Sequence, residues 1–194
     1  MLQTIIRTIE QEDLQMLKAA FLTRGIHRNS DYFEQCLEEN RYGSRITLLA
    51  FHRNELAGCC QMICESDYSK FNSQSIPEIN DLIVFPEFRR NGIATVMMDE
   101  LERIAAKHHH KVGLGVGLYK DYSTAMYLYL KRGYLPDQEG LVYKNEPAEP
   151  GTSVQVDDDL LLYFVLPLKN NEEYHKQRNH NDLIELNETS RGRD

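Results

Sequence analysis

The chain has 194 residues, which is enough for one domain with a sizeable core and too few for two comfortable ones. Its formal charge of −8 argues against non-specific binding of nucleic acid, and its composition, 41% hydrophobic and 27% charged, is that of a globular protein. No apolar run approaches the roughly 20 residues of a membrane span, and the acidic start lacks the apolar segment of a signal peptide. We therefore expect a cytoplasmic protein that needs no membrane.

The first half of the chain shows both helical and strand periodicity. Leu14, Leu17 and Phe21 have the spacing of one helix face. Taken in order, the predicted elements are a strand over 2–9, a helix that opens at Glu10–Asp13, a helix over 30–40, a hairpin over 45–65 that turns at Arg53-Asn54, a polar loop over 66–75 and a fourth strand over 77–84.

The second half begins with a helix and ends in a polar tail. The predicted elements are a helix from Gly92 to about Lys107, a strand over 111–118 with alternating glycines, a helix from Asp121 to about Lys131, and strands over 140–144 and 159–166. An acidic loop fills most of 135–159, and 169–194 is a polar tail. One strand–helix–strand unit among hairpin strands predicts an α+β fold with a mixed sheet over residues 1–168.

The stretch from Val84 to Ala94 carries the clearest chemistry. A strand ends, two arginines follow, and a helix begins at Gly92. Free N–H groups at a helix start suit a phosphate or pyrophosphate, and a glycine lets the ligand approach the backbone. The alternative is an ordinary helix cap beside solvated arginines. Neither the Walker motif nor the dinucleotide fingerprint is present.

This stretch resembles a known signature. Arg89-Arg-Asn-Gly92-Ile-Ala94 is similar to the [Q/R]-x-x-G-x-[G/A] motif of the GNAT superfamily of acyl-CoA-dependent N-acetyltransferases. The preceding strand with Val-x-Pro-Glu-x-Arg fits the same family, and Ala125–Tyr134 resembles its A-x-x-L-Y-x-K-x-G-F segment. The resemblance covers residues 2–168 and implies a sheet of six to seven strands flanked by about four helices.

The resemblance also implies a binding mode for acetyl-CoA. The donor lies in a V-shaped opening between the fourth and fifth strands, and a bulge on the fourth strand frees an N–H for the thioester carbonyl. Tyr122 and Ser123 stand where the family often has an asparagine, so a hydroxyl replaces that contact. The residues assigned to the donor are Ile83, Val84, Arg89, Arg90, Asn91, Gly92, Ile93, Ala94, Thr95, Tyr122 and Ser123.

Two residues are the candidates for proton transfer. Tyr129 occupies the tyrosine of the family segment and would protonate the departing thiolate; the alternative is a core tyrosine. Glu78 coincides with the general base of the histone-acetylating branch. Asp81 or a water chain are the rivals, and strand parity places Glu78 and Asp81 on opposite faces unless a bulge intervenes. The cysteines have no evident histidine partner, so we expect direct attack without an acyl-enzyme.

The predicted reaction is N-acetylation of a primary amine, more readily a small molecule than a protein, because the loop over 135–159 is acidic. The alternative is a catalytically idle domain that binds acyl-CoA as a sensor or interaction module. The family also allows a homodimer. We expect free thiols at the four cysteines, no metal at His108–His110, and a solvated turn at Asp157–Asp159.

Overall fold

A computed structural model describes residues 4–168 of the chain, so the predictions for residues 2, 3 and 169–194 lie outside it. This part holds one sheet of eight strands and five α-helices. In chain order the elements are β1 (Thr4–Thr8), α1 (Asp13–Thr23), α2 (Tyr32–Tyr42), β2 (Arg45–His52), β3 (Glu55–Ile63), α3 (Ser69–Ser73), β4 (Glu78–Val84), a 3-10 turn (Pro86–Phe88), α4 (Ile93–Ala105), β5 (Lys111–Gly117), a 3-10 turn (Lys120–Tyr122), α5 (Ser123–Arg132), β6 (Leu135–Tyr143), β7 (Glu146–Pro147) and β8 (Leu160–Pro167).

The sheet consists of two antiparallel halves joined by one parallel contact. Its strand order is β1-β2-β3-β4-β5-β8-β6-β7. Neighbours within β1–β4 and within β5–β8–β6–β7 run antiparallel, and only β4 and β5 run parallel. The predicted mixed sheet is therefore confirmed, with a strand count slightly above the six to seven expected.

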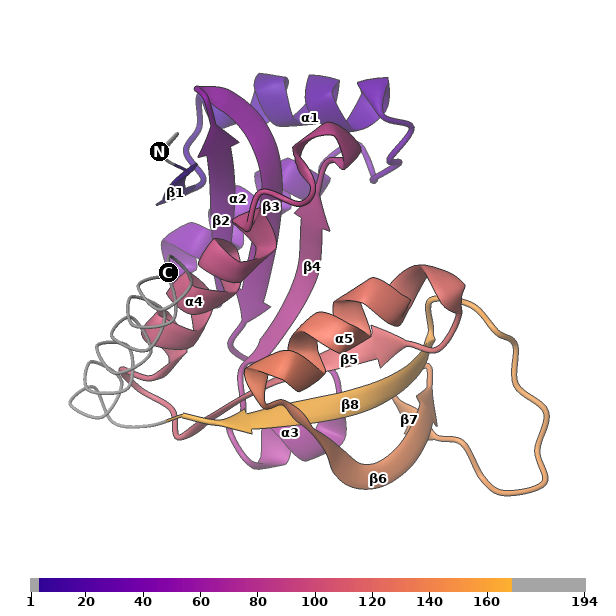
Figure 1. The fold of residues 1–194 in the computed structure, drawn as a ribbon. Helices are drawn as coiled ribbons and strands as arrows, with labels where there is room; N and C mark the ends of the chain where they lie inside the picture. Colours follow the sequence, from indigo (N-terminus) through magenta and orange to yellow (C-terminus); the bar gives the residue numbers. More distant parts are fainter. Residues whose placement is uncertain (1–3, 169–194) are drawn as a thin grey trace, which may run out of the picture.

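The parallel contact is short. Only Glu78 with Gly113 and Ile79 with Leu114 are paired, after which the two strands separate. Figure 1 shows β4 and β5 starting together and then diverging, with α5 crossing the β5 side. We call the region beyond these two pairs the splay. It divides the sheet at its centre, as the resemblance implies.

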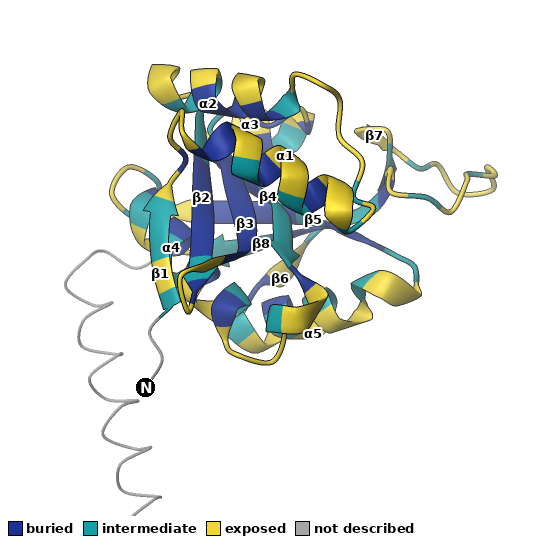
Figure 2. Cartoon of the chain, turned by 90° about the horizontal axis from the view of Figure 1, so that it is seen from above, coloured by how far each residue is buried: buried dark blue, intermediate teal, exposed yellow. Residues whose placement is uncertain are grey.

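The helices cover both faces of the sheet. A core of α4 and α5 residues packs on one face, including Met97, Leu101 and Tyr129. On the other face α1 and α2 pack over the first half, and α3 packs over the second half through Phe71. Figure 2 shows buried central strands beneath helices whose outer surfaces are exposed. We call these the α4–α5 face and the α1–α3 face.

The hairpin prediction is confirmed in detail. β2 and β3 pair antiparallel, and the two residues between them, Arg53 and Asn54, have φ of 54° and 64°. Positive φ at both central residues defines the type I′ turn that suits the twist of a two-residue hairpin. The residue pattern therefore fixes the turn, while the register shifts between Ala50 and Phe51.

Two segments differ from prediction because tertiary contacts decide them. The expected loop over 66–75 contains α3, which is anchored by the buried rings of Tyr68 and Phe71. Tyr68 stacks on Tyr163 of β8 at 3.9 Å between ring centroids. The expected strand over 140–144 begins earlier, since β6 runs from Leu135 and pairs with β8 through a bulge between Pro136 and Leu141.

The cysteines are free thiols, as expected. Cys36, Cys59 and Cys60 are buried free thiols, and Cys64 is half-buried. Within residues 4–168 no group of three or more His, Cys, Asp or Glu side chains is arranged to hold a metal ion. No helix in the same range has both the length and the apolar character needed to cross a membrane.

A buried ion network ties α4 to α5. The Arg132 guanidinium on α5 lies 2.7 Å from Asp99 and 2.6 Å from Glu102, both on α4. The Tyr134 hydroxyl also donates to Glu102, at 3.0 Å. The Glu102 side chain is only 5% exposed, so its charge depends on these partners. Because α4 packs on the first half of the sheet and α5 on the second, the network bridges the splay.

We expect Arg132→Met to lower the free energy of unfolding by about 3 kcal/mol or more, because it leaves a buried carboxylate with only the Tyr134 hydroxyl. Urea unfolding at neutral pH measures this. Arg103→Met is the matched control, since Arg103 pairs with Glu100 on the exposed face of α4 and its loss should cost under about 1 kcal/mol. Equal losses in the two variants would contradict the bridging role.

Candidate active site

A bulge on β4 shapes the first wall of the site. Cys59 pairs with Ile83 and Gln61 pairs with Asn80, so two steps along β3 oppose three along β4. Asp81 carries the irregularity, with φ of 47°. An extra residue leaves the ladder, which bends the strand and frees backbone groups at that point. The bulge implied by the resemblance is therefore present.

The bulge also changes which side chains share a face. Gln61 and Ile63 lie on the same face of β3 and pair with Asn80 and Glu78. Gln61 bonds to α2, so these positions belong to the α1–α3 face. The Asp81 carboxylate also bonds to residues that flank or begin α2. Strict alternation along β4 would place Asp81 and Glu78 on opposite faces of the sheet. The bulge at Asp81 brings both side chains to the α1–α3 face.

The turn before α4 presents a row of unpaired amides. Arg90 and Gly92 both have positive φ, of 65° and 74°, and the first helical bond runs from the Val96 N–H to the Gly92 carbonyl at 3.1 Å. Within residues 4–168, none of the six N–H groups of residues 90–95 donates to a protein acceptor. Such a row, at the positive end of a 13-residue helix, suits a phosphate group.

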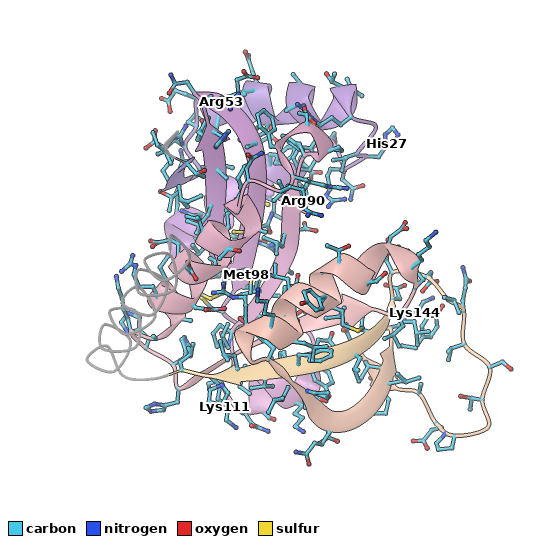
Figure 3. All side chains as sticks on the ribbon, in the orientation of Figure 1. His27, Arg53, Arg90, Met98, Lys111 and Lys144 are labelled. Atoms are coloured by element: carbon cyan, nitrogen blue, oxygen red, sulfur yellow. The ribbon has the colours of Figure 1, made fainter. Side chains whose placement is uncertain are left out.

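Side chains of the same turn hold its shape. Asn91 Nδ2 donates to the carbonyls of Phe88 and Arg89 at 3.0 and 3.2 Å. Arg89 Nε donates to the Val84 carbonyl at 3.1 Å. Arg90 is exposed and makes no hydrogen bond or ion pair with the rest of the described chain, and Figure 3 shows it beside β4. Arg90 is therefore the side chain left free to meet an anion.

Tyr129 lies on the α4–α5 face. Its side chain is 8% exposed, and its ring centroid is 6.0 Å from that of Tyr134. Burial, with a smaller effect of Cys60, raises the pKa of Tyr129 to about 12. Its hydroxyl has no hydrogen-bond partner among residues 4–168. A phenol in this state stays protonated at neutral pH.

Glu78 lies on the opposite face, beneath α3. Its carboxylate accepts a hydrogen bond from the Ser66 hydroxyl, and that hydroxyl oxygen accepts the Tyr68 N–H at 3.0 Å. Burial raises the pKa of Glu78, the Ser66 bond opposes the rise, and the charge of Asp67 adds to it. The sequence gives no signal for Ser66, because its partner is twelve residues away in another element.

Asp81 is held by the segment around the start of α2. Arg28 Nη2 lies 3.0 Å from Asp81 Oδ1, and the Tyr32 hydroxyl donates to the other carboxylate oxygen. Burial and the adjacent Asp81 charge raise the pKa of Tyr32 well above its usual range, so the tyrosine stays a donor. Asp81 is thus already engaged by two donors, whereas Glu78 has one.

The residues that replace the family asparagine also have protein partners. The Tyr122 hydroxyl donates to Asp158 at 2.9 Å, and the Tyr119 hydroxyl donates to the same carboxylate. The Ser123 hydroxyl donates to the Lys120 carbonyl. The contact of Tyr122 or Ser123 with a donor molecule stays a prediction. Asp158 is tied to two tyrosines, which the pattern of a solvated turn did not indicate.

The alternating glycines of β5 leave room for aromatic rings. A Cβ at Gly113 would overlap the ring of Phe71, and one at Gly117 would overlap the ring of Tyr122. A Cβ at Gly115 would lie 3.1 Å from Tyr163 Cε1, tighter than ordinary contact. Aromatic side chains therefore occupy the space that the three glycines leave.

The chain belongs to the Acetyltransferase (GNAT) family, whose profile matches residues 8–134, more than half of its length. A comparison with curated protein sequences gave no significant match.

Solved structures of low sequence identity share the fold. An N-acetyltransferase from Staphylococcus aureus Mu50 is 17% identical, with a TM-score of 0.61 over 86% of this chain and 99% of that one. Spermidine N-acetyltransferase from Vibrio cholerae, in complex with CoA and spermine, is 16% identical, with a TM-score of 0.61 over 86% and 96%. Arabidopsis thaliana NAA60, in complex with acetyl-CoA, is 18% identical, with a TM-score of 0.63 over 86% and 99%.

Proposed function

We propose that this protein transfers an acetyl group from acetyl-CoA to a primary amine by direct attack in a ternary complex. The observation that carries the proposal is the row of unpaired amides at residues 90–95, which lies where β4 leads into α4 beside the splay. Family membership agrees with it, and two structural neighbours were solved with CoA or acetyl-CoA. The acidic charge of the chain makes a local anion site at Arg90 more distinctive.

The residues of the β4–α4 turn fit the donor. In our proposal the amides of Arg90 through Thr95 hold the pyrophosphate, and Arg90 adds a positive charge. Ile83 and Val84, at the end of β4 beyond the bulge, are the residues that would line the pantetheine chain in this proposal. A backbone N–H freed at the bulge donates to the thioester oxygen as negative charge builds there.

The proton transfers fall to groups on the two faces of the sheet. The neutral amine attacks the thioester carbon, the carbon–sulfur bond breaks, and its electron pair leaves with the sulfur. Tyr129, on the α4–α5 face, gives its proton to the thiolate. Glu78, on the α1–α3 face, receives the proton that the amine loses, directly or through water. Separation onto two faces suits a donor and an acceptor that enter from opposite sides.

We infer that the acceptor is a small amine rather than a protein. Asp81 lies at the bulge on the acceptor face, and Asp158 is held by tyrosines beyond the end of β5. Asp81 is paired with Arg28, whereas Asp158 has only neutral hydroxyl partners, so Asp158 is the carboxylate that favours a cationic amine.

The second candidate is an idle acyl-CoA-binding domain. It is favoured by the one departure from the family pattern, at Tyr122 and Ser123, whose hydroxyls already have protein partners. The intact turn at residues 90–95 and the place of Tyr129 in the family segment favour the enzyme.

Thermal shift followed by an activity assay separates the two. We expect acetyl-CoA to raise the melting temperature, since binding only to the folded state stabilises it. Thiol release is then measured against spermidine, tyramine, lysine and a short peptide with a free N-terminus. Stabilisation without release on any amine would support the idle domain, and no stabilisation at all would remove both candidates.

Tyr129→Phe should lower kcat by about 100-fold or more, because a general acid typically contributes that much. Phenylalanine keeps the buried ring, so the Kd for acetyl-CoA and the unfolding midpoint should hardly change. Steady-state kinetics with a confirmed amine and calorimetric titration of acetyl-CoA provide the two measurements. Tyr127→Phe, on the exposed side of α5, is the control. Unaltered kcat in Tyr129→Phe would reject its role as acid.

If Glu78 is the general base, its protonation should set the loss of activity at low pH, which is the acidic limb of the pH profile. A base must be ionised, and burial raises the pKa of Glu78 above its usual 4.5. Activity should therefore fall as the pH drops through this raised pKa, and the loss should begin closer to neutrality than for a solvated glutamate. In Glu78→Gln this limb should disappear and kcat/KM at neutral pH should fall about 100-fold. A variant that keeps the wild-type limb would assign the base elsewhere.

A further inference from the structure

Asn80 occupies a singular position on β4. Ile79 is the last residue of β4 that pairs with β5. Asn80 follows it and directly precedes the bulge at Asp81. Its partner on β3 is Gln61, which bonds to α2. The Asn80 side chain therefore stands on the α1–α3 face where the two strands begin to separate.

The amide of Asn80 is unsatisfied. Its Oδ1 is buried and has no hydrogen-bond partner in the part of the chain that the structure describes. A buried acceptor without a donor costs stability, and native proteins rarely tolerate one without a reason. Thr47 Oγ1 is the other buried oxygen in this condition among the described residues, and it lies two strands away on β2.

Neighbouring polar groups on the same face are all engaged. Gln61, beside Asn80 on β3, donates to the Tyr32 hydroxyl at 2.8 Å and to Cys36 Sγ at 3.3 Å, and it accepts from Arg45. Glu78 accepts from Ser66, and Asp81 accepts from Arg28 and Tyr32. Gln61, Glu78 and Asp81, which surround Asn80, therefore all have hydrogen-bond partners, and Asn80 Oδ1 has none among the described residues.

We propose that Asn80 Oδ1 binds the acceptor substrate, by accepting one N–H of the attacking amine. The inference rests on the proposed function, in which the amine approaches on the α1–α3 face. A neutral primary amine has two N–H groups. One bonds to Asn80, the other faces the base, and the lone pair is then directed at the thioester carbon.

This arrangement also defines a specificity. An alcohol has a single O–H and cannot satisfy Asn80 and the base together. A tertiary amine has no N–H to offer. The site would therefore select nitrogen nucleophiles with two hydrogens, because an unpaired buried acceptor rejects a ligand that lacks the matching donor.

Asn80→Leu provides the sharpest test, because leucine has nearly the same shape and no polar atoms. We expect KM for the amine to rise about 10-fold or more, the loss of one buried hydrogen bond, while KM for acetyl-CoA changes less than about 2-fold. The melting temperature should stay equal or rise, since an unsatisfied acceptor has been removed. If Asn80 had only a structural role, the melting temperature would fall and both KM values would rise equally. Asn80→Ala is the second variant, should leucine pack poorly.

Thr47→Val is the matched control. It removes the other unpaired buried oxygen, two strands from the splay, and should leave both KM values unchanged. The assay uses whichever of spermidine, tyramine, lysine and the peptide the wild-type protein acetylates best.

The outcomes separate this inference from the proposed function. Wild-type protein that binds acetyl-CoA and acetylates none of these amines would defeat the proposed function. Wild-type turnover with an unchanged amine KM in both Asn80→Leu and Asn80→Ala would leave the function standing and overturn the role of Asn80. A fall in melting temperature with equal rises in both KM values would also overturn it, since that pattern marks a structural residue.

Discussion

The site depends on how little β4 and β5 are paired. Two residue pairs join the halves of the sheet, and the bulge at Asp81 follows at once on β4. A continuous parallel ladder would satisfy both strands and leave no room for a ligand between them. Since so few ladder bonds hold the halves together, their relation must be fixed elsewhere. The buried contact of Arg132 on α5 with Glu102 on α4 supplies that tie, and it does so without closing the splay.

The two faces beside the splay differ in their electrostatics. The β4–α4 turn offers free amides and Arg90, whereas the α1–α3 face presents Glu78 and the ion pair of Asp81 with Arg28. A protein with a net charge of −8 thus keeps its local positive potential where a polyanionic donor is proposed to bind. Burial serves both faces in different ways: it holds Tyr129 in its protonated form and raises the pKa of Glu78 toward neutrality.

Local signals made much of this predictable. The Arg89–Ala94 turn, the Arg53-Asn54 hairpin and the α5 segment with Tyr129 each depend on residues close in sequence, so their patterns identify them. The bulge does not, because Asp81 takes a positive φ through its contacts with Arg28 and Tyr32 from a distant segment. Likewise α3 is polar in sequence and is fixed by Tyr68 stacking on a strand more than ninety residues later. Ser66 could not be found for the same reason. Tertiary contacts override weak local preference at these places.

Thr47, Gln61 and Asn80 lie in one row across β2, β3 and β4, and they show how the sheet treats polar residues. Gln61, in the middle, is bonded on both sides of its amide by side chains that α2 and β2 supply. Asn80 stands one strand further, where the sheet opens, and its buried Oδ1 has no hydrogen-bond partner among the described residues. Folding alone would favour an apolar group at this oxygen, because the buried Oδ1 gains no bond and loses water. A polar residue that the fold itself does not satisfy is best explained by a partner that arrives later, and the edge of the splay is where such a partner would be received.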